Sequence, residues 1–415
     1  MKHDHFHTIV IGAGLLGCAT AISVKRQLGS RGRVLLIDKG TLLSGVSREH
    51  SGIVRAVNSH AASASMARSA IALWTRLDKV WGHGVPLSRC GSIWITPQNE
   101  GPKWSELETT LGSQGIDFFE VSHREVRRLG NNRLRLEAGE RVYFEPNALA
   151  INPGDLARTV IDSIRSNGVD TREHCAVTGF LGDSEDNIHT VLTSKGRFHC
   201  EKVVNASGPW SQQLLSQFDI AVPVRLEQVL VGNWKVPGLH LAADEPLIAD
   251  MTSGHYFRTW GDGQVHIHSR RRVESSFISN KFNVAAKHPD EIMKPGNDES
   301  AQLERDVRAY SRRIQARFGV EAKSINCSGA SYRYFDITPD HRFILGSDNT
   351  IENLYHCVGA GQAMKYAPIF GQLLAKAICG ESVSTPFHED FSIARFKQSH
   401  SETQQWLPQL QAATA

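Results

Sequence analysis

A glycine-rich turn near the start of the chain restricts its possible folds more than any other segment does. The turn, Gly12-Ala13-Gly14-Leu15-Leu16-Gly17, follows the β-branched run 8–11 and opens a helical stretch over 15–28. A second apolar run at 34–37 ends at Asp38. This order of strand, GxGxxG turn, helix, strand and acid is typical of a βαβ unit that binds a dinucleotide. The sequence therefore predicts a Rossmann unit at the N-terminus.

The residues of this unit match the parts of a dinucleotide. Gly12 permits the tight turn, Gly14 lets the backbone approach a pyrophosphate, and Gly17 allows the helix to pack closely. The N-terminus of the helix offers amides to the phosphate charge. Asp38 can accept hydrogen bonds from ribose hydroxyls. The alternative is an ordinary glycine-rich turn, and it leaves the surrounding strand–helix–strand order unexplained.

Size and composition agree with a folded protein that contains two domains. The chain has 415 residues, of which 40% are hydrophobic and 21% charged, with a net charge of +3. Basic and acidic residues are mixed along its length, so no basic stripe indicates nucleic acid. The seven cysteines form no CxxC pair, and no run of about 18 apolar residues could span a bilayer. We therefore expect reduced thiols, no disulfide or zinc site, and a cytoplasmic protein.

Periodicity predicts further elements along the chain. Apolar residues at helical spacing predict one helix over 63–81, and another over 156–166 that stops at Gly168. A hairpin over 191–200 is followed by an expected strand at 202–205. Short strands surrounding a polar helix are expected between about 222 and 330.

Three later segments would have no role in a simple nicotinamide dehydrogenase. They are the loop 44–55, the run Val203-Val204-Asn205-Ala206-Ser207-Gly208-Pro209-Trp210, and the C-terminal segment 332–368, which contains TPDHRFILG and GAGQAMK. Together with the N-terminal turn, they resemble the FAD-dependent family that includes D-amino-acid oxidase, glycine oxidase, sarcosine oxidase and dimethylglycine dehydrogenase. The resemblance covers nearly the whole chain.

The resemblance implies an α/β fold in which a Rossmann-like FAD-binding domain is interleaved with an α+β substrate domain on a mostly antiparallel sheet. The FAD-binding domain would comprise residues 1–85, 148–220 and 338–400, and the substrate domain residues 86–147 and 221–337. The FAD contacts would come from Gly12, Gly14, Leu15, Leu16, Gly17, Asp38, Lys39, Ser44, Ser51, Gly52, Ala206, Gly208, Trp210, Gly359, Gly361, Gln362, Ala363, Met364 and Lys365.

The resemblance also bears on how the flavin is attached. Sarcosine oxidases attach FAD through a cysteine near the position of Arg333, and no cysteine stands there. We therefore expect noncovalent FAD. His50 lies near the loop where dimethylglycine-type dehydrogenases attach flavin through histidine, and a covalent bond there is the alternative.

Five residues are the candidates for catalysis and substrate binding. Lys365 stands where sarcosine-oxidase-like members place a lysine for the substrate carboxylate, and Arg333 is a second candidate for the same role. Tyr256 and Arg258 match a family strand that borders the active site. A pair of strands with a purely structural role is the alternative, because it would show the same sequence pattern. His266 takes the position of a lysine that promotes reaction with oxygen, which leaves O2 or another acceptor open.

The implied function is oxidation of the carbon–nitrogen bond of a small amine or amino acid by hydride transfer to FAD, giving an imine that hydrolyses. A 2-hydroxy-acid dehydrogenase of the same fold is one alternative. A flavin-binding subunit that works with a protein partner in a larger complex is another. The histidines at 3, 5 and 7 and the pair His266 and His268 could mimic metal ligands, but a polar tail and a polar strand face explain them, and we expect no metal.

Overall fold

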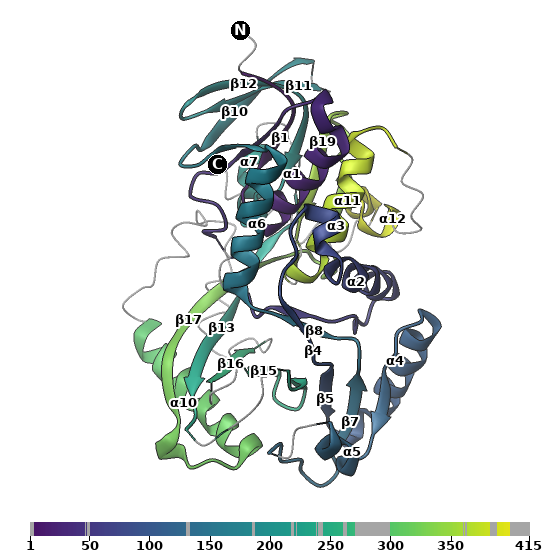
Figure 1. Cartoon of the computed structure of the whole chain (residues 1–415), viewed down its shortest axis with the longest axis vertical. Helices are drawn as coiled ribbons and strands as arrows, with labels where there is room; N and C mark the ends of the chain where they lie inside the picture. The colour runs from purple at the N-terminus through teal and green to yellow at the C-terminus, as the bar shows by residue number, and fades with distance from the viewer. Residues whose placement is uncertain are drawn as a thin grey trace.

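The computed structural model describes residues 4–45, 47, 50–129, 133–184, 187–216, 220, 222–237, 239, 244–259, 264–269, 299–359, 361, 363–381 and 388–398. Two large sheets organise these residues, one toward each end of the molecule, with a small sheet between them (Figure 1). None of the described helices is long and apolar enough to cross a membrane.

The first sheet is built around the N-terminal βαβ unit. Its central strand β1 lies parallel to β2 on one side and to β12 on the other. β19 continues the parallel arrangement beside β12, and β10, β11 and β18 add antiparallel pairs. The strands of this sheet are β1 (His5–Ile11), β2 (Val34–Ile37), β9 (Asp170–Arg172), β10 (Val177–Ser184), β11 (Asn187–Thr193), β12 (Gly196–Asn205), β18 (Ile344–Ser347) and β19 (Leu354–Val358).

The second sheet runs in the order β17-β13-β16-β15-β14-β5-β7-β6, and its neighbours are antiparallel except for the pair β14 and β5. Its strands are β5 (Ser92–Thr96), β6 (Phe119–Val121), β7 (Arg141–Glu145), β13 (Arg225–Lys235), β14 (Leu247–Asp250), β15 (His255–Thr259), β16 (Gln264–Ser269) and β17 (Asn326–Ile337). The small sheet between the two contains β3 (Ile53–Val54), β4 (Leu87–Arg89) and β8 (Leu149–Ile151).

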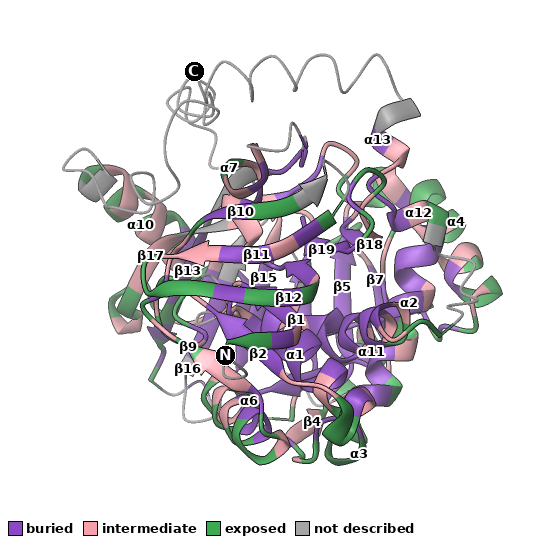
Figure 2. Ribbon diagram, turned by 90° about the horizontal axis from the view of Figure 1, so that it is seen from above, coloured by how far each residue is buried: buried purple, intermediate pink, exposed green. Residues whose placement is uncertain are grey.

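Helices cover both sheets. The α-helices are α1 (Leu15–Leu28), α2 (Ala61–Trp74), α3 (Leu77–Trp81), α4 (Gly101–Ser113), α5 (His123–Arg128), α6 (Pro153–Asn167), α7 (Ser211–Leu215), α10 (Glu299–Phe318), α11 (Ala367–Ile378), α12 (His388–Phe391) and α13 (Arg395–Gln398). Short 3₁₀ segments are η1 (Gly29–Arg31), η3 (Gln98–Glu100), η4 (Gly208–Trp210), η7 (Ala322–Ser324) and η8 (Ala363–Tyr366). The strands in the middle of the molecule are largely buried (Figure 2).

Close backbone approach joins the helices of the first sheet. α11 packs against α1, and a Cβ added to Gly371 would lie 2.5 Å from the carbonyl oxygen of Ala19. α6 packs on the same helix and has clear end signals. The Asn152 side chain accepts from the amides of Gly154 and Asp155, and Gly168 ends the helix in the left-handed region at φ 70°.

The structure confirms the fold class and corrects two of the expected elements. The helix expected over 63–81 is two helices, because the chain turns at Thr75 and Arg76 between α2 and α3. The strand expected at 202–205 is the second half of the continuous strand β12. Its first half pairs with β11 and its second half with β19, and it also pairs with β1. The pattern of apolar residues predicted which faces are buried but not where a helix breaks.

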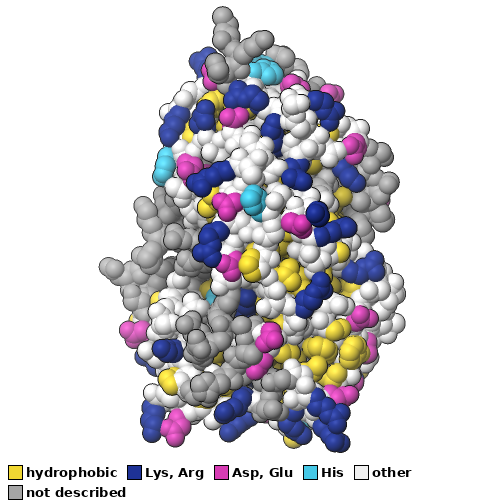
Figure 3. Space-filling view, in the orientation of Figure 1, with side chains coloured by type: hydrophobic (Ala, Val, Ile, Leu, Met, Phe, Trp, Pro, Cys, Tyr) yellow, Lys and Arg dark blue, Asp and Glu magenta, His cyan; other side chains and the backbone are white. Residues whose placement is uncertain are grey.

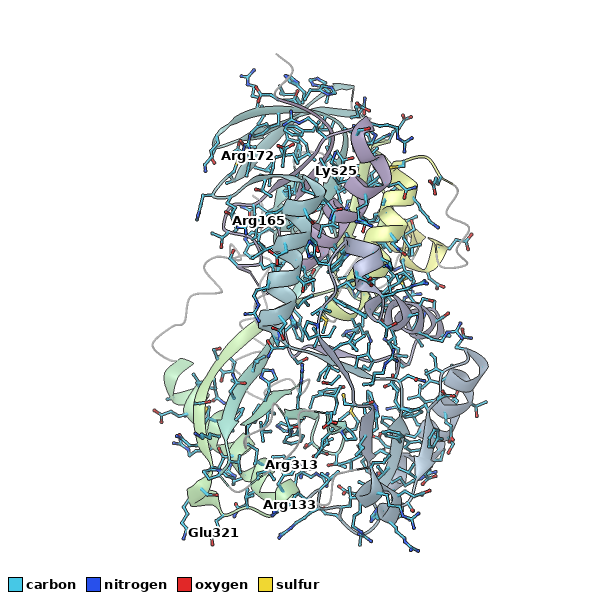
Figure 4. All side chains as sticks on the ribbon, viewed as in Figure 1. Lys25, Arg133, Arg165, Arg172, Arg313 and Glu321 are labelled. Carbon is cyan, nitrogen blue, oxygen red and sulfur yellow. The ribbon has the colours of Figure 1, made fainter. Side chains whose placement is uncertain are left out.

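A buried ion cluster joins α10 to the end of β14 and to the loop that precedes β7. Arg317, on α10, is 1% exposed and donates to both carboxylate oxygens of Asp250 and both of Glu140. It also donates to the carbonyl of Arg135 and to the hydroxyl of Thr252. Arg313, labelled in Figure 4, adds a hydrogen bond of 2.7 Å to Asp250. The depressed pKa of Asp250, about 2, follows from these arginine contacts working against its burial, which would raise the value.

The exposed charges on one face of the molecule have no single sign. On the face shown in Figure 3, basic and acidic side chains are interspersed over both halves of the molecule. This distribution agrees with the mixed charges of the sequence.

Candidate active site

A cavity of about 1140 Å³ lies where the two sheets meet. The first sheet contributes the glycine-rich turn and the ends of β2 and β12, and the second contributes Val231, Tyr256, His266, Phe335 and Asp336. The volume exceeds the roughly 300–1,000 Å³ of an ordinary small-molecule pocket, so the cavity has room for a dinucleotide together with a small second molecule.

Most of the residues expected to contact the cofactor line this cavity. They are Gly12, Gly14, Leu15, Leu16, Asp38, Lys39, Ser44, Ser51, Ala206, Gly208, Trp210, Gly361, Met364 and Lys365. Gly17, Gly52 and Gly359 lie outside the wall. Gln362 lies outside the described residues, and only the backbone of Ala363 is described, within η8.

The glycines of the turn have the distinct tasks expected of them. Gly12 has φ +104°, and a Cβ on it would lie 2.3 Å from the carbonyl oxygen of Ala206. A Cβ on Gly17 would lie 1.8 Å from the carbonyl oxygen of Gly12, so this glycine lets the helix close onto the turn. A Cβ on Gly14 would instead project toward the hydroxyl of Ser47, 3.1 Å away, into space that the cavity occupies. The turn is therefore a cradle in which a side chain would take the place of a ligand.

Hydrogen bonds hold the polar groups of this cradle in place. The Asp38 carboxylate accepts from the amide of Ala13 at 2.6 Å and from that of Gly40 at 2.7 Å. The hydroxyl of Ser47 accepts from the Leu15 amide at the N-terminus of α1. Because each carboxylate oxygen has a further lone pair, Asp38 can still accept from ribose hydroxyls. These groups fit the dinucleotide predicted from the sequence.

Next to this cradle, an aromatic and a basic side chain form part of the cavity wall. The Lys39 ammonium lies 3.8 Å from the centre of the Trp210 ring, a cation–π contact. Both residues line the cavity. Together they place an aromatic ring and a positive charge side by side in the wall.

At the other end, two buried basic residues lie in the cavity wall. Arg55 is 8% exposed and Lys365 is 2% exposed. Their segments are in contact, because β3, which directly precedes Arg55, packs against η8, which contains Lys365. The Arg55 guanidinium stacks 4.7 Å from the ring of Trp94, and the Lys365 ammonium lies 4.8 Å from the ring of Tyr366.

Arg55 was not among the candidates from the sequence, although it ends the loop 44–55 on which the resemblance partly rests. A sequence signal for it does exist. A charged residue directly after the β-branched pair Ile53-Val54 must enter a partly buried strand end, where charge is rare unless it has a task.

Two histidines in the wall are neutral at neutral pH. Burial, with Arg258 adding to it, lowers the pKa of His266 to about 4, and burial lowers that of His50 to about 3. His266 Nδ1 lies 2.8 Å from the side-chain oxygen of Asn233. The Gly52 amide donates to His50 Nδ1, so the ring hydrogen of His50 is on Nε2. A cationic His266, which would take the place of the family's lysine, is disfavoured by this burial.

The remaining candidates lie at different distances from the cavity. Tyr256 lines it and meets Trp94 edge to face at 6.2 Å. Arg258 lies behind the wall and donates to the carbonyls of Ser51 and Ile151 at 2.6 and 2.8 Å. It therefore fixes the loop at 51–52 to β8, the structural alternative left open above. Arg333 pairs with Val229 in β17, and its side chain is not described.

A backbone contact joins the C-terminal glycine motif to the cavity. Gly359 has φ +74°, and its amide donates to the Asp336 carboxylate at 2.8 Å. Asp336 itself lines the cavity. Within the described ranges, no cluster of three or more His, Cys, Asp or Glu residues could hold a metal ion.

Comparison with known proteins agrees with this geometry. Residues 7–377 match the family model DAO, described as FAD dependent oxidoreductase. The chain is 24% identical to 4-methylaminobutanoate oxidase (formaldehyde-forming) of Paenarthrobacter nicotinovorans over 90% of its own length but only 44% of that protein. It is 23% identical to the peroxisomal sarcosine oxidase of Mus musculus, covering 96% of this chain and 97% of that one.

Solved structures share the fold at low sequence identity. L-proline dehydrogenase from P. horikoshii superposes with a TM-score of 0.78 at 17% identity, over 95% of this chain and 98% of that one. A family match that spans the two sheets and the cavity between them, together with the dinucleotide cradle, leads to one conclusion. The chain belongs to the DAO family of FAD-dependent oxidoreductases.

Proposed function

We propose that this protein oxidises the carbon–nitrogen bond of a small amine that carries a carboxylate. The observation that supports this most directly is the pair Arg55 and Lys365, two buried basic side chains in the wall of the cavity. Two basic side chains in the same part of the cavity make its wall positive there, which suits an anionic group of the substrate. A carboxylate is the anion whose geometry suits an arginine fork beside a lysine point charge.

The names of the relatives support the same class of substrate. One relative is an oxidase of 4-methylaminobutanoate and the other of sarcosine, and both compounds carry an amine and a carboxylate. Identity of 23 to 24% does not select one substrate, so the proposal is for the class.

Each group in the wall has a task in this proposal. Gly12, Gly14 and Asp38 hold the dinucleotide, and bound FAD supplies the acceptor for a hydride. Arg55 and Lys365 bind the substrate carboxylate and so orient the carbon that loses hydrogen. The substrate becomes an imine, and water then converts it into a carbonyl compound and a free amine.

The neutral histidines suit an amine that must react in its uncharged form. Neither His50 nor His266 carries a charge at pH 7, so neither repels a cation nor attracts the substrate carboxylate. Tyr256 and Phe335 add apolar surface that limits water near the reacting carbon.

The test is an anaerobic absorbance titration of the FAD-loaded protein with sarcosine, 4-methylaminobutanoate, glycine and L-proline. Lactate serves as the hydroxy-acid counterpart, and the amide of sarcosine as the analogue without a carboxylate. We expect bleaching of the flavin band by at least one amino acid and a much higher half-saturating concentration for the amide. Bleaching by lactate alone would contradict the proposal and favour a hydroxy-acid dehydrogenase.

Admitting air afterwards distinguishes the electron acceptor. Prompt return of the band indicates an oxidase, and a lasting bleached state indicates a dehydrogenase that needs another acceptor. A Lys365→Met variant is the control. It should retain the flavin band and require a higher amino-acid concentration for bleaching.

A further inference from the structure

Behind the cavity wall lies a carboxylate that the proposed reaction does not use. Glu145, the last residue of β7, is 0% exposed and does not line the cavity. One of its oxygens accepts from the amide of Ala56, and the other accepts from the hydroxyl of Ser92 at 2.9 Å. The same hydroxyl accepts from the indole nitrogen of Trp94 at 2.8 Å.

These contacts converge on Arg55 from two sides. Ala56 is its neighbour in the chain, so the hydrogen bond to Glu145 fixes the backbone at the base of the arginine. Trp94 is the ring on which the guanidinium stacks at 4.7 Å. Arg55 also donates to the carbonyl of Val57. Glu145 is thus bonded to the backbone next to Arg55 and, through the Ser92 hydroxyl, to the ring on which Arg55 stacks.

The pattern of donors favours an ionised Glu145. Because the Trp94 indole can only donate, the Ser92 oxygen accepts from it, and the Ser92 hydrogen is left to donate to Glu145. The Ala56 amide can likewise only donate. Burial outweighs the lowering effects of the Ala56 amide, Arg55, Ser92 and Lys365, so the pKa of Glu145 is raised above its ordinary value, and the case for the ionised form rests on the donors around it. A buried charge is tolerated where such donors and opposite charges surround it.

We propose that Glu145 is a positioning residue for the carboxylate-binding Arg55. It touches neither substrate nor cofactor and acts by holding Ala56 and, through Ser92, Trp94. The inference rests on the proposed function, because it concerns how the carboxylate site is built.

The test is a double-mutant cycle on ligand binding to the FAD-loaded protein. Acetate is titrated and read from the change in flavin absorbance, and acetamide is the uncharged probe of the same shape. The variants are Glu145→Gln, Arg55→Met and the pair together. Glu145→Gln keeps the shape of the side chain and removes its charge.

We expect Arg55→Met to weaken acetate binding about 100-fold, the effect of losing a buried charge-assisted contact. Glu145→Gln should weaken it about 10-fold, with acetamide binding unchanged. In the Arg55→Met background, Glu145→Gln should weaken acetate binding less than about twofold, because a positioning residue has no effect once the residue that it positions is gone. With an amino-acid substrate, Glu145→Gln should raise KM and leave kcat within about threefold.

Glu120→Gln is the matched control. Glu120 lies on β6, next to β7 in the same sheet, and it pairs with Arg141 near the surface. This change should leave acetate binding as it is in the wild type. If the Glu145→Gln variant does not bind FAD, Ser92→Ala takes its place in the cycle. Ser92→Ala breaks only the link from Glu145 to Trp94, so we expect it to weaken acetate binding about threefold.

The outcomes separate this inference from the proposed function. If Arg55→Met does not weaken acetate binding, the carboxylate site itself is wrong. If Arg55→Met weakens binding but Glu145→Gln does not, or if the two losses multiply, only the role of Glu145 is overturned. Tighter acetate binding in Glu145→Gln would also overturn it, because the acid would then oppose the bound anion.

Discussion

Replacement of Arg317 by Met tests how much the buried ion cluster contributes to stability. The change removes the donors to Asp250, Glu140, Arg135 and Thr252 in one step. Removing one partner of a buried ion pair costs about 3–5 kcal/mol, because the other charge remains buried. Asp250 keeps Arg313, and Glu140 keeps the backbone amide of Glu137 at 2.8 Å. We therefore expect the free energy of unfolding to fall by about 3 kcal/mol, the lower end of that range.

The assay measures urea and thermal unfolding of the FAD-loaded variant and wild-type proteins at pH 7. Unfolding is followed by circular dichroism and by the increase in flavin fluorescence as FAD is released. Arg308→Met on the same helix is the control. The Arg308 side chain is 61% exposed and pairs with Glu304 at 3.5 Å, so its removal should cost less than about 1 kcal/mol. If Arg317→Met unfolds within about 1 kcal/mol of this control, the cluster does not stabilise the fold and the reasoning is wrong.

Three further predictions follow from the same structure. Gly12→Ala places a Cβ 2.3 Å from the Ala206 carbonyl oxygen at φ +104°, so the purified variant should lack the flavin band, and a normal band would show that the turn can relax. Asp250 and Asp340 both have a pKa depressed to about 2 by paired arginines, so their contribution to stability is complete above about pH 4 and is lost as the pH falls toward 2. Melting temperatures between pH 5 and 2.5 should fall accordingly, and a flat profile would refute this. Lys365→Met should raise KM for an amino-acid substrate about tenfold or more with the FAD content unchanged, and an equal KM would remove Lys365 from the carboxylate site.

Local chemistry explains why the dinucleotide cradle could be predicted from the sequence. The task of Gly17 depends on the carbonyl oxygen of Gly12, which belongs to the same motif, so the motif itself specifies that geometry. The close approach of Gly12 to Ala206 joins two distant segments, and only the choice of glycine could be predicted there. Asp38 follows from the same unit, because β2 must lie beside β1. The predicted fold class and FAD are confirmed. The domain boundaries and the covalent state of the flavin stay predictions.

The substrate end was harder to predict because its residues meet only after folding. Arg55 and Lys365 are more than three hundred positions apart in the sequence. Nothing near Glu145 in the chain indicates that it contacts Ala56 and Ser92. A polar helix was expected between about 222 and 330, and α10 is such a helix, yet its role in burying Arg317 depends on Asp250 and Glu140 in other segments. Patterns along one segment carry no information about such partners.

The pairing of distant strands also has a consequence for how the protein is made. β1 has β12 as a neighbour, with Ile9 beside Val203, and β5 lies beside β14, with Ile93 beside Ile248. At roughly 5–20 residues per second, the ribosome needs about 10–40 s between the synthesis of Ile9 and that of Val203. During this time the apolar edge of β1 has one of its two neighbours and not the other. Nascent chains of this protein should therefore bind chaperones until β12 emerges, and chains released before β12 should aggregate rather than fold.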